Sequence, residues 1–259
     1  MKSDTKKIVK GAATGALVAT IGFFCAAPFC RAANGTTVKS KPDVVIYEGT
    51  YPGWPWIAAG ADGTLYCVFR DGTEHGFSAA GRALLTKSSD LGKTWTAVRI
   101  PESPEFTGDE WDLVETAPGH LLAIMRNANH SKPAALCCSE SRDGGLTWSM
   151  PKATNLTTGL FAPGQIFLQG VNRTPTVIYP DRRMISVSAV KSDDPARLKW
   201  KVDSLLPCYL YNADQSPIPD GSYAVSAPTG PNQRLVVDYE IRPKTKRITG
   251  YFIDFPADW

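Results

Sequence analysis

Residues 88–95 read Ser-Ser-Asp-Leu-Gly-Lys-Thr-Trp, and residues 141–148 read Ser-Arg-Asp-Gly-Gly-Leu-Thr-Trp. Both stretches fit the pattern S-x-D-x-G-x-T-W, which we call an Asp box. Its Asp and Ser side chains can bond nearby backbone N–H groups and close a tight turn, and its glycine adopts a conformation that other residues resist. Its tryptophan is expected to cover the apolar flank of the hairpin. We therefore predict structural roles for Ser88, Asp90, Gly92, Trp95, Ser141, Asp143, Gly145 and Trp148.

The similarity between the two Asp boxes extends upstream, to a strand that ends in an arginine. Residues 62–70 align with residues 118–126, and in both an arginine follows the turn glycine by seven residues of β-prone sequence. Seven residues of strand span roughly 23 Å, so Arg70 and Arg126 are expected at the strand end remote from that turn. Their recurrence at one position of the repeat predicts ligand binding, although a solvated strand-end arginine explains each equally well.

Two further units follow, and the four together indicate a β-propeller. A third unit lies over residues 180–189, with a reduced Asp turn at residues 192–194 and Trp200, and a fourth lies over residues 232–240. Units of roughly 50 residues, built from short strands between turn signals, are typical of propeller blades. We predict one all-β domain over residues 43–259, a β-propeller with Asp-box repeats and fewer than six regular blades.

The two ends of this domain each contain a β-prone segment. Residues 43–48 belong to no blade, and residues 248–255 end the last unit. Pairing of these two segments would close the ring and remove an exposed sheet edge. We therefore expect them to form neighbouring strands.

The composition is that of a globular chain with a sizeable core. Of its 259 residues, 43% are hydrophobic and 20% are charged, and the formal net charge is +3, which fits one large domain. A charge this small gives no basic surface on the scale that nucleic-acid binding needs, so we expect no nucleic-acid partner. Because no Cys-x-x-Cys or Cys/His ligand spacing occurs, we expect neither a metal nor another cofactor.

The N-terminus has the pattern of a secretory signal peptide. Four lysines among the first ten residues precede a largely apolar run over residues 11–30, and Cys30-Arg31-Ala32 offers a cleavage site before Ala33. We predict a signal peptide over residues 1–32 and a linker over residues 33–42, hence a secreted or periplasmic protein without a membrane contact after cleavage. The alternative is an uncleaved membrane anchor, because the apolar run approaches 20 residues.

The Asp boxes and two further segments resemble the sialidase (neuraminidase) superfamily of β-propellers. Residues 110–127, with Glu110 before a strand pair that ends in Arg126-Asn127, are similar to a sialidase stretch of the same kind. Residues 223–226 (Tyr-Ala-Val-Ser), followed by residues 235–240 (Leu-Val-Val-Asp-Tyr-Glu), resemble the late sialidase segment that holds the catalytic tyrosine. The similarity runs across most of the predicted propeller and is most specific in the first two blades.

The resemblance implies that Tyr223 is a nucleophile and Glu110 the base that activates it. In sialosides the anomeric carbon carries a carboxylate that would repel a carboxylate nucleophile. A neutral phenol avoids this repulsion but requires a base, since its reference pKa is about 10. Arg126 matches one of the three arginines whose guanidinium groups bind the substrate carboxylate. Asp71 and Glu74 lie in the loop of the acid/base residue.

The remaining predicted site residues are those expected at the same rim as the two arginines. Aromatic faces there can stack on sugars, and charges can orient them. Candidate substrate contacts are Trp54, Arg70, His75, Asp112, Arg126 and Glu240. For His75 an ordinary loop position is the alternative, for Glu240 an ion pair with an arginine, and for Tyr223 a core or rim position.

These observations predict an exported glycoside hydrolase of the sialidase type, an exo-α-sialidase or a divergent exoglycosidase acting on glycans. The alternative is a non-catalytic carbohydrate-binding or surface-interaction propeller. It is motivated by residues 51–57, which hold no arginine where the family has its first one. A purely structural module remains a third possibility for any Asp-box repeat.

Overall fold

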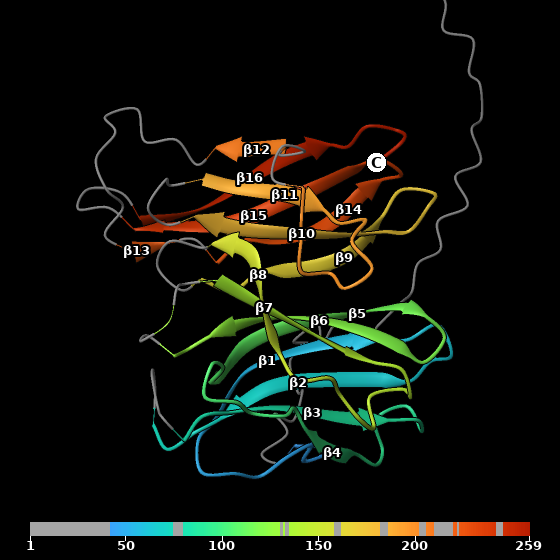
Figure 1. Ribbon diagram of the computed structural model, residues 1–259, viewed down its shortest axis with the longest axis vertical. Coiled ribbons are helices and arrows are strands. Elements are labelled where there is room, and N and C mark those ends of the chain that lie inside the picture. The colour runs from blue at the N-terminus through green and yellow to red at the C-terminus, as the bar shows by residue number, and fades with distance from the viewer. Residues whose placement is uncertain are drawn as a thin grey trace, which may run out of the picture. The chain divides into compact units, whose positions relative to one another are not determined.

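The computed structural model describes residues 42–74, 80–129, 132, 135–157, 162–181, 186–201, 206–209, 220–221, 223–241 and 246–259. All of its strands lie in one compact unit, Asp43–Trp259. The described residues contain sixteen β-strands and no helix (Figure 1), which confirms the predicted all-β fold. Among them there is accordingly no helix long and apolar enough to cross a membrane.

The strands form four antiparallel sheets of four strands each, one for each predicted unit. The first sheet contains β1 (Pro52–Ala59), β2 (Leu65–Asp71), β3 (Arg82–Ser88) and β4 (Thr96–Arg99). The second contains β5 (Gly108–Ala117), β6 (His120–Asn127), β7 (Ala135–Ser141) and β8 (Lys152–Thr157). The third contains β9 (Gln165–Gln169), β10 (Thr174–Asp181), β11 (Ser186–Lys191) and β12 (Leu206–Tyr209). In the fourth, β13 (Asp220–Gly221) and β14 (Val225–Gly230) pair with β15 (Gln233–Ile241), which also pairs with β16 (Lys246–Asp254).

Consecutive sheets pack face to face, because alternate residues of each strand point to opposite faces. On β2, Tyr66 and Val68 join the core between the first two sheets, together with Trp111 and Leu121 from the second. A second core joins the second and third sheets, and a third joins the third and fourth. This repeated stacking brings residues from distant parts of the sequence to common strand ends.

The Asp boxes form the turns between the third and fourth strands of the first two sheets. The Asp90 carboxylate accepts hydrogen bonds from the backbone N–H groups of Lys93 and Thr94 and from the Thr94 hydroxyl. Asp143 accepts the equivalent bonds from the backbone and hydroxyl of Thr147. These bonds, with that from the Thr147 hydroxyl first, lower the pKa of Asp143 to about 2. They stabilise the ionised carboxylate, so both turns are held by charge-assisted hydrogen bonds.

The third sheet has the same turn with one residue inserted. The Asp194 carboxylate accepts bonds from the N–H groups of Leu198 and Lys199, and the Trp200 indole N–H donates to the carbonyl of Arg197 at 2.9 Å. Arg197 has a positive φ of 54°, the left-handed conformation that glycine supplies in the other boxes. The reduced Asp turn of the sequence is therefore a working Asp box.

The expected strand over residues 43–48 is wrong. These residues form no strand, and Ile46 and Tyr47 instead pack on the face of the first sheet that points away from the second. The Tyr47 ring lies 4.7 Å from that of Phe69, and its hydroxyl donates to Asp71. Because these side-chain contacts anchor the segment across the sheet, it covers a face rather than extending an edge. Within the described residues β16 pairs with β15 alone.

Candidate active site

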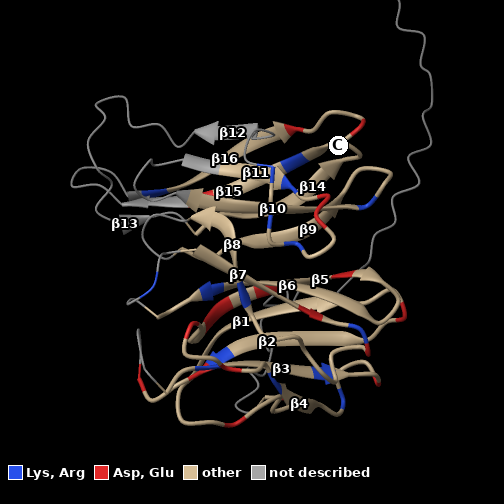
Figure 2. Cartoon of the chain, viewed as in Figure 1, with Lys and Arg blue, Asp and Glu red and all other residues tan. Residues whose placement is uncertain are grey.

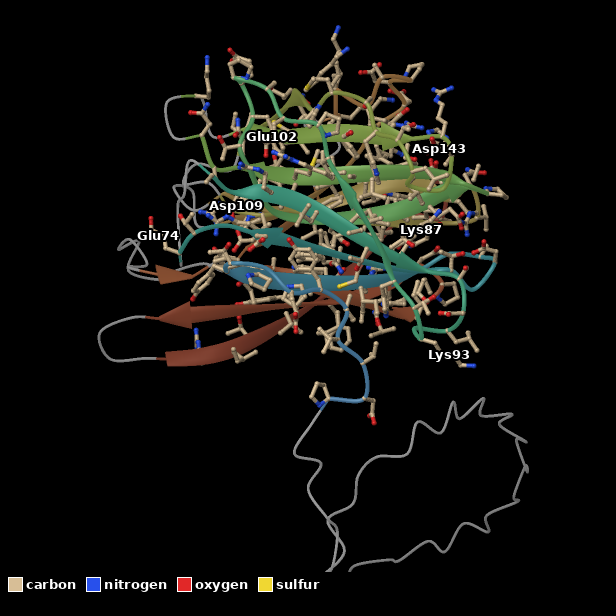
Figure 3. All side chains as sticks on the ribbon, turned by 90° about the horizontal axis from the view of Figure 1, so that it is seen from below. Glu74, Lys87, Lys93, Glu102, Asp109 and Asp143 are labelled. Atoms are coloured by element: carbon tan, nitrogen blue, oxygen red, sulfur yellow. The ribbon has the colours of Figure 1, made fainter. Side chains whose placement is uncertain are left out.

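One end of the strands collects most of the predicted site residues. In the first sheet Leu65 pairs with Ser88 and Arg70 pairs with Ala83, so Arg70 and the Asp box lie at opposite ends of β2. The second sheet repeats this arrangement with Arg126 near the end of β6. Figure 3 shows Glu74 and Asp109 at one end of the ribbon and Lys93 and Asp143 at the other.

Arg126 connects residues from two sheets that are not neighbours in sequence. Its Nη1 donates hydrogen bonds to the Glu110 carboxylate and, at 3.0 Å, to the Tyr223 hydroxyl oxygen. Two oxygens that share one donor nitrogen lie within about 6 Å of each other. The structure therefore brings Glu110, Arg126 and Tyr223 together, as the sequence predicts for their positions, while their catalytic roles stay predictions.

A β-bulge at the start of β5 places two carboxylates on Arg126. The register of β5 against β6 shifts between Gly108 and Trp111, which breaks the alternation that would point Asp109 and Glu110 to opposite faces. Both side chains consequently reach the same guanidinium group. Gly108 permits this, because a Cβ there would lie 2.3 Å from the backbone nitrogen of Ala83.

Asp109 lies between Arg70 and Arg126. One of its oxygens is 3.7 Å from Arg70 Nε and the other is 3.2 Å from Arg126 Nε. Burial raises the pKa of Asp109 to about 6, against the pull of the two arginines. The sequence prediction omitted this residue, although its position beside Glu110 at the strand entrance was a signal that could have found it.

Asp238 binds the backbone of Tyr223. It is a second residue that the sequence prediction omitted. The backbone N–H of Tyr223 donates to Asp238 Oδ1 at 2.8 Å, and Asp238 is buried on β15. Its available signal was its position two residues before Glu240, since residues i and i+2 of a strand share one face. Asp238 thus fixes the loop that carries the phenol.

The predicted acids Asp71 and Glu74 differ in their surroundings. The Asp71 carboxylate accepts hydrogen bonds from the Tyr47 hydroxyl at 2.9 Å and from the backbone N–H of Tyr51 at 2.8 Å, so both of its oxygens hold the segment before β1. Glu74 is exposed, and its backbone carbonyl accepts a bond from Arg70. Its carboxylate is therefore accessible to a ligand.

Asp112 connects the second and third sheets. Its carboxylate accepts hydrogen bonds from the backbone N–H groups of Leu113, at 2.8 Å, and Ile166, at 3.0 Å. Burial raises its pKa to about 7. This placement gives Asp112 a structural contact, and its predicted substrate contact has no support in the geometry.

Two predicted residues cannot be placed. His75 lies outside the described residues. Glu240 belongs to β15, where its backbone pairs with Gly221 and Arg247, but its side chain lies outside the described part of the chain.

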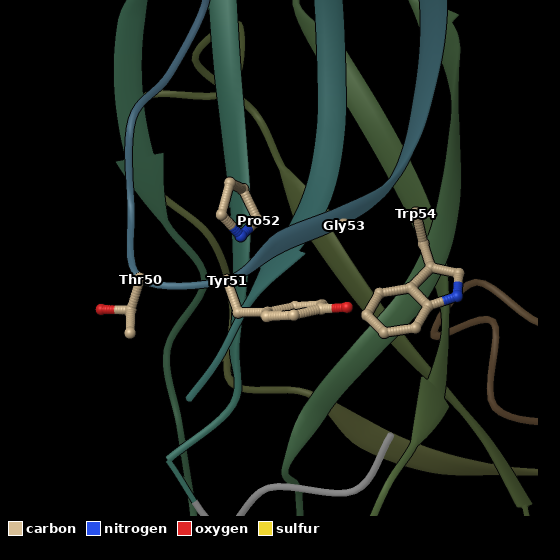
Figure 4. A pocket seen from close by; sticks show the side chains of 5 residues that line it. All are labelled: Thr50, Tyr51, Pro52, Gly53 and Trp54. Atoms are coloured by element: carbon tan, nitrogen blue, oxygen red, sulfur yellow. The ribbon is translucent and has the colours of Figure 1, made fainter. Parts of the chain in front are cut away.

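A cavity of about 500 Å³ opens beside this group of residues. It is lined by residues 50–54 (Figure 4), whose Tyr51 ring points toward Trp54. The guanidinium carbon of Arg70 lies over the Trp54 ring, 5.4 Å from the ring centroid. Arg70 in turn contacts Asp109, which also contacts Arg126. The volume is within the range of small-ligand sites, which run from about 300 to 1,000 Å³.

Acidic and basic side chains alternate around the site. Figure 2 shows red and blue segments mixed at this end of the first two sheets. No group of three His, Cys, Asp or Glu side chains among the described residues has the arrangement to hold a metal ion. The thiols of Cys67, Cys137 and Cys138 are free and buried.

Comparisons with known proteins support this architecture. Residues 57–160 match the family model of the BNR repeat-like domain. No curated protein sequence matches the chain.

Three solved structures share the fold at low sequence identity. A protein of unknown function from Dyadobacter fermentans is 17% identical with a TM-score of 0.62, over 77% of this chain and 52% of its own. The NanB sialidase of Streptococcus pneumoniae (K499G mutant) is 17% identical with a TM-score of 0.52, over 81% and 32%. The GH93 α-L-arabinofuranosidase of Fusarium graminearum is 15% identical with a TM-score of 0.56, over 83% and 66%. The chain thus spans about half of the first protein and a third of the second.

Proposed function

Because the chain has a sialidase-like β-propeller fold and carries a BNR repeat-like domain, we propose that it is an exported glycoside hydrolase that acts on glycans. The single observation that carries this proposal is the contact of Arg126 with both Glu110 and Tyr223. A base, a nucleophile and a cation that stabilises their charges are the groups that a covalent mechanism needs. The proposed export rests on the signal-like N-terminus.

In the proposed first step, Tyr223 Oη attacks the anomeric carbon while Glu110 accepts the phenol proton. The glycosidic C–O bond breaks, its oxygen takes a proton from an acid, and a glycosyl-tyrosine forms. Arg126 stabilises the negative charge that develops on the phenol oxygen during the attack. A water molecule then attacks the anomeric carbon and gives a proton to the carboxylate that acted as the acid, while the bond from the anomeric carbon to Tyr223 Oη breaks. The phenol recovers its proton from Glu110, and the free sugar is released.

Glu74 fits the acid role better than Asp71. Both oxygens of Asp71 accept hydrogen bonds that hold the backbone before β1, whereas Glu74 is exposed at the edge of the site. The same residue would accept a proton from water in the second step. The cavity beside Trp54 would hold the sugar, with the indole and the Tyr51 ring offering apolar faces to its C–H groups.

A non-catalytic carbohydrate-binding propeller is the second candidate. The observation that favours it is the absence of an arginine from residues 51–57 together with the complete burial of Arg70. The first ligand-binding arginine of the family would then be missing, and the guanidinium group of Arg70 would be covered. Such a protein would bind glycans without turnover.

Hydrolysis of fluorogenic glycosides by purified protein tests the two candidates. The panel would include a 4-methylumbelliferyl α-sialoside, an α-L-arabinofuranoside and common hexopyranosides, each tested with wild type and Glu110→Gln. We expect turnover of at least one glycoside and its loss in the variant. Glycan-array binding without turnover of any substrate at high protein concentration would instead support the binding module.

A further inference from the structure

A carboxylate of the protein itself occupies the space between the two rim arginines. The two oxygens of Asp109 face Arg70 Nε and Arg126 Nε at 3.7 and 3.2 Å. Both contacts are ion pairs without a hydrogen bond, because Arg70 Nε and Arg126 Nε have no hydrogen-bond partner among the described residues. Guanidinium groups are the usual partners of carboxylates in proteins, so a ligand carboxylate would suit the same space. Because Asp109 belongs to β5, a ligand carboxylate cannot displace it by simple competition.

The burial of the three side chains leaves little room for a second anion. The Arg70 side chain is 0% exposed, that of Asp109 is 8% exposed and that of Arg126 is 18% exposed. Glu110 contacts the same Arg126 guanidinium. Two cations therefore face two carboxylates, so these four described side chains together have no excess positive charge with which to offset the desolvation of an anionic ligand.

We propose that Asp109 takes the place of a ligand carboxylate between Arg70 and Arg126, and so restricts this site to sugars without a carboxylate at the reacting carbon. Asp109 is then a specificity-determining residue. The inference rests on the proposed function for the statement that the ligand is a sugar.

The phenol of Tyr223 is compatible with an uncharged substrate. An anionic sugar is one reason to avoid a carboxylate nucleophile, but crowding by the protein's own carboxylates is another. Asp109 and Glu110 already contact the guanidinium group that binds the Tyr223 oxygen. A third carboxylate at residue 223 would be repelled, whereas a neutral phenol is not.

Chemical rescue of Asp109→Ala tests the proposal without any need for catalysis. The variant leaves a gap between two guanidinium groups, so sodium formate should raise its melting temperature by about 2 °C or more through binding to the folded state. Sodium chloride at equal ionic strength and neutral formamide should not. Wild type should show no difference between formate and chloride.

Glu102→Ala is the matched control, because Glu102 also lies between two arginines. It is 3.1 Å from Arg82 Nε and 2.8 Å from Arg99 Nη2, but these side chains are 35% and 54% exposed, and Figure 3 shows Glu102 and Asp109 as separate positions. No formate effect is expected in this variant. A formate effect in wild type, or none in Asp109→Ala, would overturn the proposal.

Asp109→Asn provides a second variant that keeps the side-chain volume if the alanine variant does not fold. N-acetylneuraminate, whose carboxylate is on the anomeric carbon, should stabilise this variant against heat more than its neutral methyl ester at the same concentration, because the amide leaves two arginines facing one carboxylate. This preference should be absent from wild type. An equal response of the variant to both sugars contradicts the proposal. If no glycoside is hydrolysed while the formate rescue succeeds, the proposed function fails and the role of Asp109 stands. If wild type hydrolyses sialosides and neutral glycosides equally well, the proposed function stands and the role of Asp109 as a specificity-determining residue fails.

Discussion

Arg126 and Tyr223 are joined by a 3.0 Å hydrogen bond although 97 residues separate them in the sequence. The arginine is the last residue but one of β6 in the second sheet, and the tyrosine lies two residues before β14 in the fourth. Such a contact requires the sheets to present the same strand ends to one another. The relationship therefore connects the propeller architecture directly to the proposed chemistry.

Removal of the phenol oxygen should abolish turnover and spare binding. Tyr223→Phe deletes the proposed nucleophile but keeps the ring, so kcat on the best glycoside should fall by about 10³-fold or more. Ligand binding, measured by calorimetry with the free sugar product, should change by less than about threefold. These two measurements separate a chemical role of the oxygen from a role in packing.

Tyr251→Phe serves as the control for this variant. Tyr251 is half-buried on β16 and packs against the core between the third and fourth sheets, so its kcat should match that of wild type. If Tyr223→Phe retained full activity, Tyr223 would be an ordinary rim tyrosine. Equal losses of activity in both variants would indicate a general effect on the fourth sheet.

Loss of the Arg126 guanidinium should strongly destabilise the fold. Arg126→Ala leaves Asp109 and Glu110 buried without the cation that they share, and breaking a buried pair in this way costs about 3–5 kcal/mol. Arg99→Ala removes a 54% exposed partner of Glu102 and should cost less than about 1 kcal/mol. Urea denaturation of both variants measures the difference, and a loss of equal size in both would mean that the site carboxylates are well solvated.

Two buried carboxyl groups should make the folded state less stable as the pH rises. Burial raises the folded-state pKa of Asp109 to about 6 and that of Asp112 to about 7, whereas an unfolded aspartate titrates near 3.9. Between about pH 4 and 7 the folded state therefore binds more protons than the unfolded state, so the free energy of unfolding should decrease with increasing pH.

Asp112→Asn checks the source of this pH dependence. The amide cannot ionise, so the slope of unfolding free energy against pH should become shallower between pH 4 and 7. The Asp boxes leave this window unaffected, since hydrogen bonds lower the pKa of Asp90 and Asp143 and their contribution is lost in more acidic solution. A slope identical to that of wild type would show that Asp112 is ionised throughout.

Local repetition made the fold predictable, and the arginine positions with it. The Asp boxes and the glycine-to-arginine spacing specify the turns and the strand lengths. The sequence alone therefore assigns Arg70 and Arg126 to one rim. The segment over residues 43–48 could not be placed in this way. Its β-prone residues suit an edge strand and a covering segment equally, and long-range contacts of Tyr47 with Phe69 and Asp71 decide between them.

The inward direction of Asp109 was not predictable either. A regular strand points neighbouring residues to opposite faces, and the bulge between Gly108 and Trp111 that overrides this rule depends on how β5 approaches β3. The resemblance to sialidases singled out Glu110, Arg126 and Tyr223, because motifs at the right spacing in the sequence mark their positions. It gave no information on the carboxylate that separates the two arginines.

Replacement of Gly145, the glycine of the second Asp box, by alanine should destabilise the fold. Gly145 has a φ of 86°, and a Cβ there would lie 3.3 Å from Leu121 Cδ1. Gly145→Ala should therefore lower the free energy of unfolding by about 1–2 kcal/mol through left-handed backbone strain. Gly230→Ala provides the comparison, because its nearest neighbour would lie at 3.8 Å and its φ is not in the left-handed region. Denaturant midpoints of the two variants measure the difference.

The same substitution should leave catalysis unchanged, because the Asp box lies at the strand ends remote from Arg126. The folded fraction of Gly145→Ala should therefore keep the kcat of wild type, and a reduced kcat would show that the turn is coupled to the site.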